Sequence, residues 1–243
     1  MDFFLYSVLG KIDYEMSRHL QLQLLQVIYQ QNLPGILLVL EHSPVFTLGK
    51  SAIRNHLLVS DEVLEREGIP VFSIERGGDI TFHGPGQIVG YPLVNLWFWK
   101  KDIHLFLRAL EEMLIQFLLD YGLTAFRLPP HTGVWVNERH PEKIAAIGVA
   151  VKKWITFHGF ALNISTDLKY FSYIIPCGIR DKGVISLEKA CKKTFSDGDR
   201  EAMKRDLVDD FSGVFGFQMV EVKNEILAKW ASGDGSFSLS SLG

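Results

Sequence analysis

The chain contains 243 residues, and its 25 Lys and Arg against 28 Asp and Glu give a formal net charge of −3. Hydrophobic residues form 47% of the chain and charged residues 22%, a balance that excludes wholesale disorder. The mild acidity argues against a dedicated nucleic-acid binder, whose affinity depends on clustered Lys and Arg. Two cysteines, Cys177 and Cys191, are too few for a disulfide framework or a four-cysteine metal site.

The first residues, MDFFLYSVLGKIDYEM, contain neither a basic segment nor a small-residue cleavage site. This pattern and the low cysteine count predict a cytoplasmic protein without a targeting leader. The most apolar stretches, 33–40 and 103–121, are too short or too charged to cross a bilayer. We therefore expect no membrane association.

Apolar residues recur at helical spacing in two long segments, 14–31 and 103–121. Asp102 is placed to cap the second helix and Gly122 to end it. A shorter helix is predicted over 61–67, between an N-cap at Ser60 and a C-terminal glycine, and further helical character over 186–193, 199–212 and a short segment near the end of the chain.

Short runs of apolar and β-branched residues between turn signals predict the strands. These strands are 36–40, 70–75, 88–94, 134–136, 144–151, 154–158, 160–164 and 217–222. Helices that flank one β-rich body predict an α/β (α+β) fold with a mixed sheet, as a single domain over residues 1–230. The Gly/Ser-rich end, 231–243, predicts a disordered tail.

The segment RGGDITFHGPGQ, residues 76–87, holds four glycines and one proline in twelve positions. Its glycine pairs allow close approach of the backbone to a ligand, and Arg76 and His83 supply polar groups at its ends. A glycine-rich hairpin without a ligand is the alternative interpretation. The pattern is neither a P-loop nor a dinucleotide-binding fingerprint, because neither consensus is present and a strand follows.

Cys177 lies in IIPCGIR, between a rigid proline and a glycine that leaves the thiol accessible. A reactive thiol needs a nearby positive charge or base, and a free cysteine is more often a small buried hydrophobe. Cys191 is surrounded by lysines, but neighbours one or two positions away on a helix point to other faces. Local sequence favours Cys177 only slightly.

Lys143 begins an apolar strand, and its side chain either extends to solvent or projects into a cleft as a proton shuttle. His83 and His158 are each a candidate base for a Cys–His hydrolase, and each has a satisfied core histidine as its alternative. The histidines lack the short spacing of a zinc site, so we expect neither a metal nor another cofactor.

Beyond these local patterns, RGGDITFHGPGQIVGYPLVNL at 76–96 closely resembles the signature of the lipoyl(octanoyl) transferases, the octanoyl-acyl carrier protein:protein N-octanoyltransferase family. The likeness covers about residues 36–190. It continues in EHSPVFTLGK, TGVWV, KIAAIGV, HGFALN and PCGI. Two departures are Ser43, where the family often has proline, and Lys50, where it often has arginine. Neither lies among the site residues that the resemblance implies.

The resemblance implies the fold of the biotin/lipoate protein ligase catalytic domain. It implies that Cys177 is the nucleophile that forms an acyl thioester, and that Lys143 activates this cysteine and handles protons. The acyl-binding residues that it implies are Arg76, Gly77, Gly78, Asp79, Ile80, Thr81, Phe82, His83, Ala146, Ile147, Gly148, Gly159, Phe160 and Ala161.

The implied reaction moves octanoyl from acyl carrier protein to a lysine of lipoyl domains, those of the 2-oxoacid dehydrogenases and the glycine cleavage H protein. A thioester donor is already activated, so no ATP is required. The alternatives are an ATP-dependent lipoate ligase, an acyltransferase that relays octanoyl between carrier domains, a non-catalytic carrier-binding paralogue and a Cys–His hydrolase.

Overall fold

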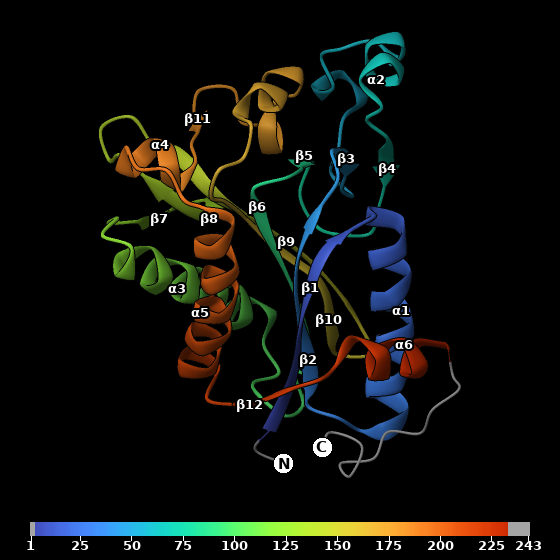
Figure 1. Ribbon diagram of the computed structural model, residues 1–243. Coiled ribbons are helices and arrows are strands. Elements are labelled where there is room, and N and C mark those ends of the chain that lie inside the picture. Colours follow the sequence, from blue (N-terminus) through green and yellow to red (C-terminus); the bar gives the residue numbers. More distant parts are fainter. Residues whose placement is uncertain (1–2, 233–243) are drawn as a thin grey trace.

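The computed structural model describes residues 3–232, which form two sheets and the helices around them (Figure 1). The larger sheet has nine strands in the order β12-β1-β2-β6-β10-β9-β8-β7, with β11 paired to β9. Its strands are β1 (Phe3–Ile12), β2 (Gly35–His42), β6 (Gln87–Val94), β7 (Phe126–Leu128), β8 (His131–Val136), β9 (Glu142–Lys152), β10 (Ile155–Asn163), β11 (Gly183–Val184) and β12 (Gln218–Glu221). The smaller sheet has the order β4-β3-β5 and consists of β3 (Val45–Leu48), β4 (Val71–Ser73) and β5 (Ile80–His83).

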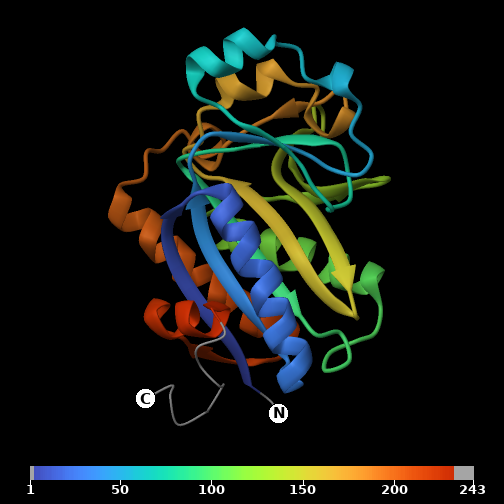
Figure 2. The same ribbon diagram turned by 90° about the vertical axis from the view of Figure 1, so that its right-hand side faces the viewer.

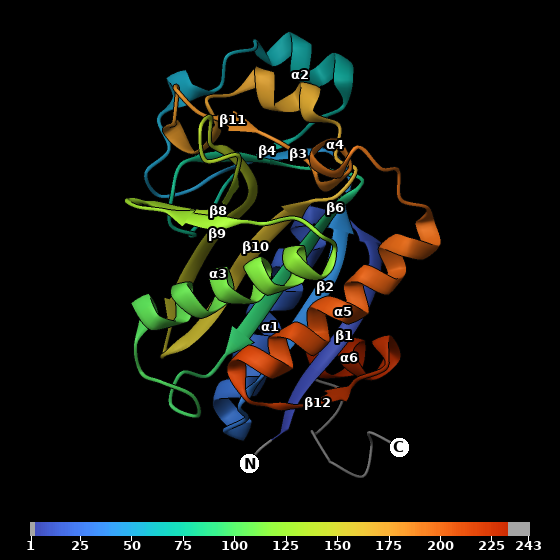
Figure 3. The same cartoon turned by 90° about the vertical axis from the view of Figure 1, so that its left-hand side faces the viewer.

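Helices cover both faces of the larger sheet. Helices α3 (Ile103–Asp120) and α5 (Asp197–Phe215) pack on one face, where the largest apolar cluster lies (Figure 3). Helices α1 (Tyr14–Gln31) and α6 (Asn224–Ser232) cover the other face (Figure 2). The remaining elements are α2 (Asp61–Glu67), α4 (Leu187–Cys191) and the 3₁₀ turns η1 (Arg54–His56), η2 (Leu168–Tyr173) and η3 (Pro176–Gly178).

The mixed sheet between helices confirms the predicted fold class. The Asp102 carboxylate accepts hydrogen bonds from the backbone N–H groups of His104 and Leu105, at 2.8 and 3.0 Å, as expected of an N-cap. Ser60 is the N-cap residue of α2, but its side chain makes no capping hydrogen bond. The predicted position of the helix start is therefore confirmed, and the predicted hydrogen bond is wrong. Gly68 ends the same helix in the left-handed conformation.

The hairpin that carries much of the site differs from its sequence-based assignment. Sequence patterns predict a break at His158-Gly159, whereas β10 runs without interruption through both residues. His158 has φ of +56°, and its backbone N–H donates to Gln21 Oε1 at 2.8 Å. The pairing with β9 is nevertheless kept, since His158 pairs with Val149 and Gly159 with Gly148.

Five strands of the fold have no counterpart among the predicted strands: β1, β3, β5, β7 and β11. The first lies between β2 and β12 and is parallel to both. Its register shifts between Val8 and Lys11, which breaks the simple alternation. At the other end, α6 extends to Ser232, so the predicted tail begins inside a helix and its remainder, 233–243, lies outside the described residues. Residues 3–232 contain no helix that is both long and apolar enough to cross a membrane.

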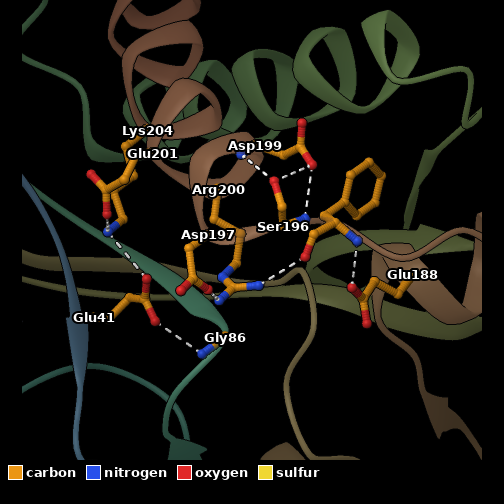
Figure 4. A network of polar contacts seen from close by, with 10 residues as sticks. Glu41, Gly86, Glu188, Ser196, Asp197, Asp199, Arg200, Glu201 and Lys204 are labelled. Atoms are coloured by element: carbon orange, nitrogen blue, oxygen red, sulfur yellow. Dashed lines mark hydrogen bonds and ion pairs between the residues drawn. The ribbon is translucent and has the colours of Figure 1, made fainter.

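A buried lysine ties α5 to the glycine-rich segment (Figure 4). Lys204 is 1% exposed, and its Nζ lies 3.1 Å from Glu41 Oε1 and 2.6 Å from Glu201 Oε1. The other oxygen of Glu41 accepts a 2.9 Å hydrogen bond from the N–H of Gly86, in the turn between β5 and β6. The Glu41 carboxylate therefore couples a C-terminal helix to the turn that joins the two sheets.

Replacing Lys204 by methionine removes the positive charge beside the Glu41 carboxylate. A buried charge that loses its partner destabilises the folded state. We expect Lys204→Met to lower the free energy of unfolding by about 3 kcal/mol in urea denaturation at pH 7.5. Lys189→Met removes an exposed lysine of α4 and serves as the control, with an expected change below about 0.5 kcal/mol. Equal stability of the two variants would contradict a structural role for this ion pair.

Candidate active site

A cleft of about 410 Å³ lies between the β9–β10 hairpin, the smaller sheet and the first turn of α1. All but two of the predicted site residues line it. The exceptions are Ile80 and Phe82, which the family resemblance implies as part of the segment 76–83. Along β5 successive side chains point to opposite faces, so Thr81 and His83 line the cleft while these two are buried in the apolar cluster of the smaller sheet.

Cys177 lies in a tight turn at one end of the cleft. It is the central residue of η3, with φ of +55°, and Gly178 follows with φ of +72°. Two consecutive left-handed residues are uncommon, and for a non-glycine residue this conformation costs free energy that the surroundings must offset. The thiol is partly buried and lines both the main cleft and a small adjoining cavity.

Lys143 lines the same two cavities as Cys177. Only 7% of it is exposed, so its side chain projects into the cleft instead of extending to solvent. The ammonium donates to the carbonyl oxygen of Thr132 at 3.1 Å and lies 4.7 Å from the ring centroid of Trp135. A carbonyl and an aromatic face thus hold one buried cation at the Cys177 end of the cleft.

Arg76 is a second buried cation at the cleft. Its Nη2 donates to Thr47 O and Thr47 Oγ1, at 2.7 and 2.9 Å, and its Nη1 donates to Gly77 O at 3.1 Å. Burial lowers the pKa of the guanidinium from its ordinary value, and its charge interaction with Cys177 opposes that shift. Arg76 and Cys177 line the same cleft.

The pair His56 and Asp79 packs against the cysteine turn, and His56 was not singled out in the sequence. His56 Nδ1 lies 2.6 Å from Asp79 Oδ2, and Asp79 Oδ1 accepts from the N–H of Ile80 at 2.7 Å. A Cβ on Gly178 would lie 2.8 Å from Asp79 Oδ2 and 3.3 Å from His56 Cε1. The carbonyl oxygen of His56 also accepts from the N–H of Ile175. This pair therefore supports the backbone on both sides of Cys177.

The two candidate histidine bases have other partners than the thiol. His83 Nδ1 donates to Gln87 Oε1 at 2.9 Å, and Gln87 Nε2 donates to Asn163 Oδ1 at the same distance. Burial lowers the pKa of His83 well below its usual value. Burial likewise lowers the pKa of His158 to about 4, although Glu75 opposes that shift. Both histidines line the cleft as neutral groups at pH 7.

Cys191 has the surroundings of a structural residue. It lies on α4, packs against the main apolar cluster and has its sulfur 3.9 Å from Tyr121 O. Among residues 3–232, no group of three or more His, Cys, Asp or Glu side chains is arranged to hold a metal ion. The nucleophile candidate with a cleft, a buried lysine and a supported turn is Cys177.

A mixed sheet with helices on both faces, and a cleft holding a cysteine and a buried lysine, defines a catalytic domain suited to acyl-group chemistry. The chain belongs to the family described as lipoyl protein ligase A/B catalytic domain, which residues 13–212 match. Its curated relatives make it an enzyme, an acyltransferase.

The octanoyltransferase of Solibacter usitatus is 47% identical over 212 residues, covering 87% of this chain and 93% of that protein. That of Thermoanaerobacter sp. is 44% identical over 221 residues, 90% and 93% of the two chains. A T. acidophilum protein solved with bound lipoic acid shares the fold, with a TM-score of 0.70 at 18% identity over 96% of this chain and 94% of that chain.

Gly178→Ala tests the support of the cysteine turn, because the new Cβ would meet the Asp79 carboxylate. We expect a loss of roughly 100-fold in acyl-transfer rate, the scale of a misplaced reacting group. Gly216→Ala is the matched control, since Gly216 has φ of +74° and no atom within 4 Å of the built Cβ. Both variants carry the cost of a positive φ, about 1 kcal/mol, in urea unfolding. Similar acyl-transfer rates in the two would contradict the role given to the turn.

Buried histidines make stability depend on pH. His42 and His158 have pKa values of about 4 in the folded protein because they are buried, against about 6.5 in an unfolded chain. The unfolded chain therefore binds more protons between pH 4 and 6.5, and the free energy of unfolding falls as the pH falls through this window. From pH 7 to pH 5 we expect a loss of about 1–2 kcal/mol per histidine, measured by urea unfolding.

In the same measurement, His158→Gln should show a shallower decline with falling pH than the wild type, because one buried ionisable group is removed. His104→Gln, at an exposed position of α3, should decline as the wild type does. A His158→Gln profile parallel to that of the wild type would contradict this assignment.

Proposed function

We propose that this protein is an octanoyltransferase that works through a thioester on Cys177. The proposed donor is octanoyl-acyl carrier protein. The proposed acceptor is the ε-amine of a lysine on lipoyl domains, those of 2-oxoacid dehydrogenases and of the glycine cleavage H protein. The observation that carries the proposal is the presence of Cys177 and Lys143 at one cleft. The names of the relatives support octanoyl as the acyl group.

In the first step the Cys177 thiolate attacks the carbonyl carbon of the donor thioester. A carbon–sulfur bond to Cys177 forms and the bond to the carrier sulfur breaks. The carrier leaves as a thiolate and takes a proton from the Lys143 ammonium, which becomes a neutral amine. One thioester replaces another, so the step is nearly balanced in bond energy. The Lys143 ammonium and the Arg76 guanidinium are the buried cations available to stabilise the thiolate.

In the second step the acceptor amine attacks the Cys177 thioester. A carbon–nitrogen bond forms, the carbon–sulfur bond to Cys177 breaks, and the amine loses a proton to yield an amide. Lys143 is placed to exchange that proton, because its side chain lines the cleft beside the cysteine. Aminolysis of a thioester runs downhill, so the donor supplies all the driving force.

The walls of the cleft suit an acyl chain. Ala146, Ile147 and Gly148 of β9 face Ala161, Phe160 and Gly159 of β10 in the register of the hairpin, and all six line the cleft. Gly148 is in a confined place, since a Cβ there would lie 3.0 Å from Arg76 Cδ. Burial of an eight-carbon acyl chain contributes roughly 5 kcal/mol at about 0.8 kcal/mol per methylene.

An ATP-dependent lipoate ligase is the main alternative, because a protein solved with bound lipoic acid has the same fold. Such an enzyme would activate a free acid and needs no thiol. Two further alternatives are a hydrolase, which would release free octanoate, and a carrier-binding protein without activity. The thiol in its supported left-handed turn favours the transferase over the ligase and the binding protein. The hydrogen bond of His83 to Gln87 argues against the Cys–His hydrolase.

We expect wild-type protein incubated with octanoyl-acyl carrier protein to gain the mass of one octanoyl group, as measured by intact-protein mass spectrometry. Cys177→Ala should gain none, and Cys191→Ala should behave as the wild type, because Cys191 lies outside the cleft and packs against the main apolar cluster. Addition of a lipoyl domain should discharge the adduct and label that domain. An intact donor with no adduct on the wild type, together with ATP-dependent labelling from free octanoate, would establish the ligase instead.

A further inference from the structure

The cleft is closed at the end away from Cys177 by a layer of aromatic rings. Tyr14, His83, Tyr91 and His158 all line this end, and each is at most 7% exposed. Strand β5 shows that it is the far end. Asp79, immediately before β5, contacts the cysteine turn, whereas His83 is the last residue of that strand. The Tyr14 ring stacks on the His83 ring, with centroids 5.9 Å apart.

The distance available between the two ends follows from strand geometry. The four residues from Asp79 to His83 span about 13 Å, and the three from Ala161 to His158 on β10 span about 10 Å, at roughly 3.3 Å per residue. Ala161 lines the small cavity beside Cys177, and His158 lines the ring-closed end. This interval is comparable to the length of an extended eight-carbon acyl chain.

Tyr14 is held firmly on both its backbone and its ring. It is the first residue of α1, directly after the N-cap Asp13, and its carbonyl oxygen accepts from Ser17 Oγ at 2.8 Å. Its ring is 5.2 Å from His42 and 5.6 Å from Phe72, centroid to centroid. Figure 1 shows this end of α1 beside β4, the strand that carries Phe72. A ring fixed on several sides cannot easily move aside for a longer ligand.

The rings at this end are neutral at pH 7, which suits an apolar chain terminus. Burial raises the pKa of Tyr14 and of Tyr91 and lowers that of His83. The Tyr91 hydroxyl also has a polar partner, because it lies 2.7 Å from His42 Nε2. An acyl methyl group would therefore meet ring surfaces instead of charges.

We propose that Tyr14 is a specificity-determining residue whose ring sets the maximum length of the acyl chain on Cys177. This inference rests on the proposed function, since it concerns the chain carried by the Cys177 thioester. The acyl carbonyl lies beside Cys177 and Lys143, and the chain runs along β9 and β10 until its methyl end meets the Tyr14 ring. Chains longer than about eight carbons would have to displace a buried, stacked aromatic side chain.

The test offers the protein an equimolar mixture of pantetheine thioesters of six, eight, ten and twelve carbons, with the adducts on Cys177 resolved by intact mass. Wild type should favour the eight-carbon adduct. Tyr14→Ala should raise the ratio of ten- to eight-carbon adduct by about tenfold or more, because a methylene in an apolar pocket is worth that much. Tyr14→Trp should shift the preference to six carbons, and Tyr14→Phe should leave it unchanged.

Tyr29→Ala is the matched control, since it removes an exposed tyrosine from the same helix. It should keep the wild-type preference. If thermal unfolding shows that Tyr14→Ala does not fold, Tyr14→Leu replaces it, and the tryptophan variant tests the opposite direction independently. An unchanged eight-carbon preference in folded Tyr14→Ala or Tyr14→Leu and in Tyr14→Trp would overturn the proposal. Absence of any adduct on wild type would instead overturn the proposed function.

Discussion

The cleft depends on one join between the two sheets, the contact of the Arg76-Gly77 segment with β9. The N–H of Gly77 donates to Val149 O at 2.9 Å, and Arg76 next to it bonds to the carbonyl and hydroxyl oxygens of Thr47 in β3. A buried guanidinium without such acceptors would carry a large desolvation cost. The Arg76 hydrogen bonds attach the segment to the smaller sheet, and the Gly77 N–H attaches it to β9. The two attachments together hold the smaller sheet beside the β9–β10 hairpin, and the cleft lies between them.

The contact between the Arg76-Gly77 segment and β9 also sets the positions of Cys177 and Lys143. Asp79 follows the same segment, and through His56 it supports the turn that holds Cys177. Lys143 is the second residue of β9, the strand to which the segment is bonded. A displacement of the smaller sheet would thus move the cysteine turn relative to the lysine. Even a shift of about 1 Å matters for reacting groups, so the rigidity of the join serves the chemistry.

Much of this arrangement could be predicted from sequence, because the strongest signals are local. The glycine pairs in 76–87 predict that the backbone approaches a ligand closely. Helical periodicity predicts the bounds of α1 and α3 to within one residue. His56 could not be found in the same way, since it is one polar residue in an irregular segment and its partner Asp79 is 23 positions away. The sequence could also have excluded Ile80 and Phe82 from the cleft. Side chains alternate along a strand, so these two point to the opposite face from Thr81 and His83.

The choice between Cys177 and Cys191 shows where local reasoning ends. Lysines surround Cys191 in sequence, yet this residue packs against the main apolar cluster, whereas the cations that line the cleft with Cys177 come from β9 and from the segment before β5. Residue proximity in the chain therefore leaves the surroundings of each thiol undefined, and the tertiary fold shows which cations line the cleft with Cys177.

The fold alone does not decide the reaction, since a protein solved with bound lipoic acid shares it at 18% identity. What separates the possible reactions is the state in which the acyl group arrives. A free acid must be activated by a nucleotide, whereas a thioester can be passed to a thiol without further energy. The proposed function assigns this chain to the second case, because Cys177, in its left-handed turn, and the buried Lys143 line one cleft.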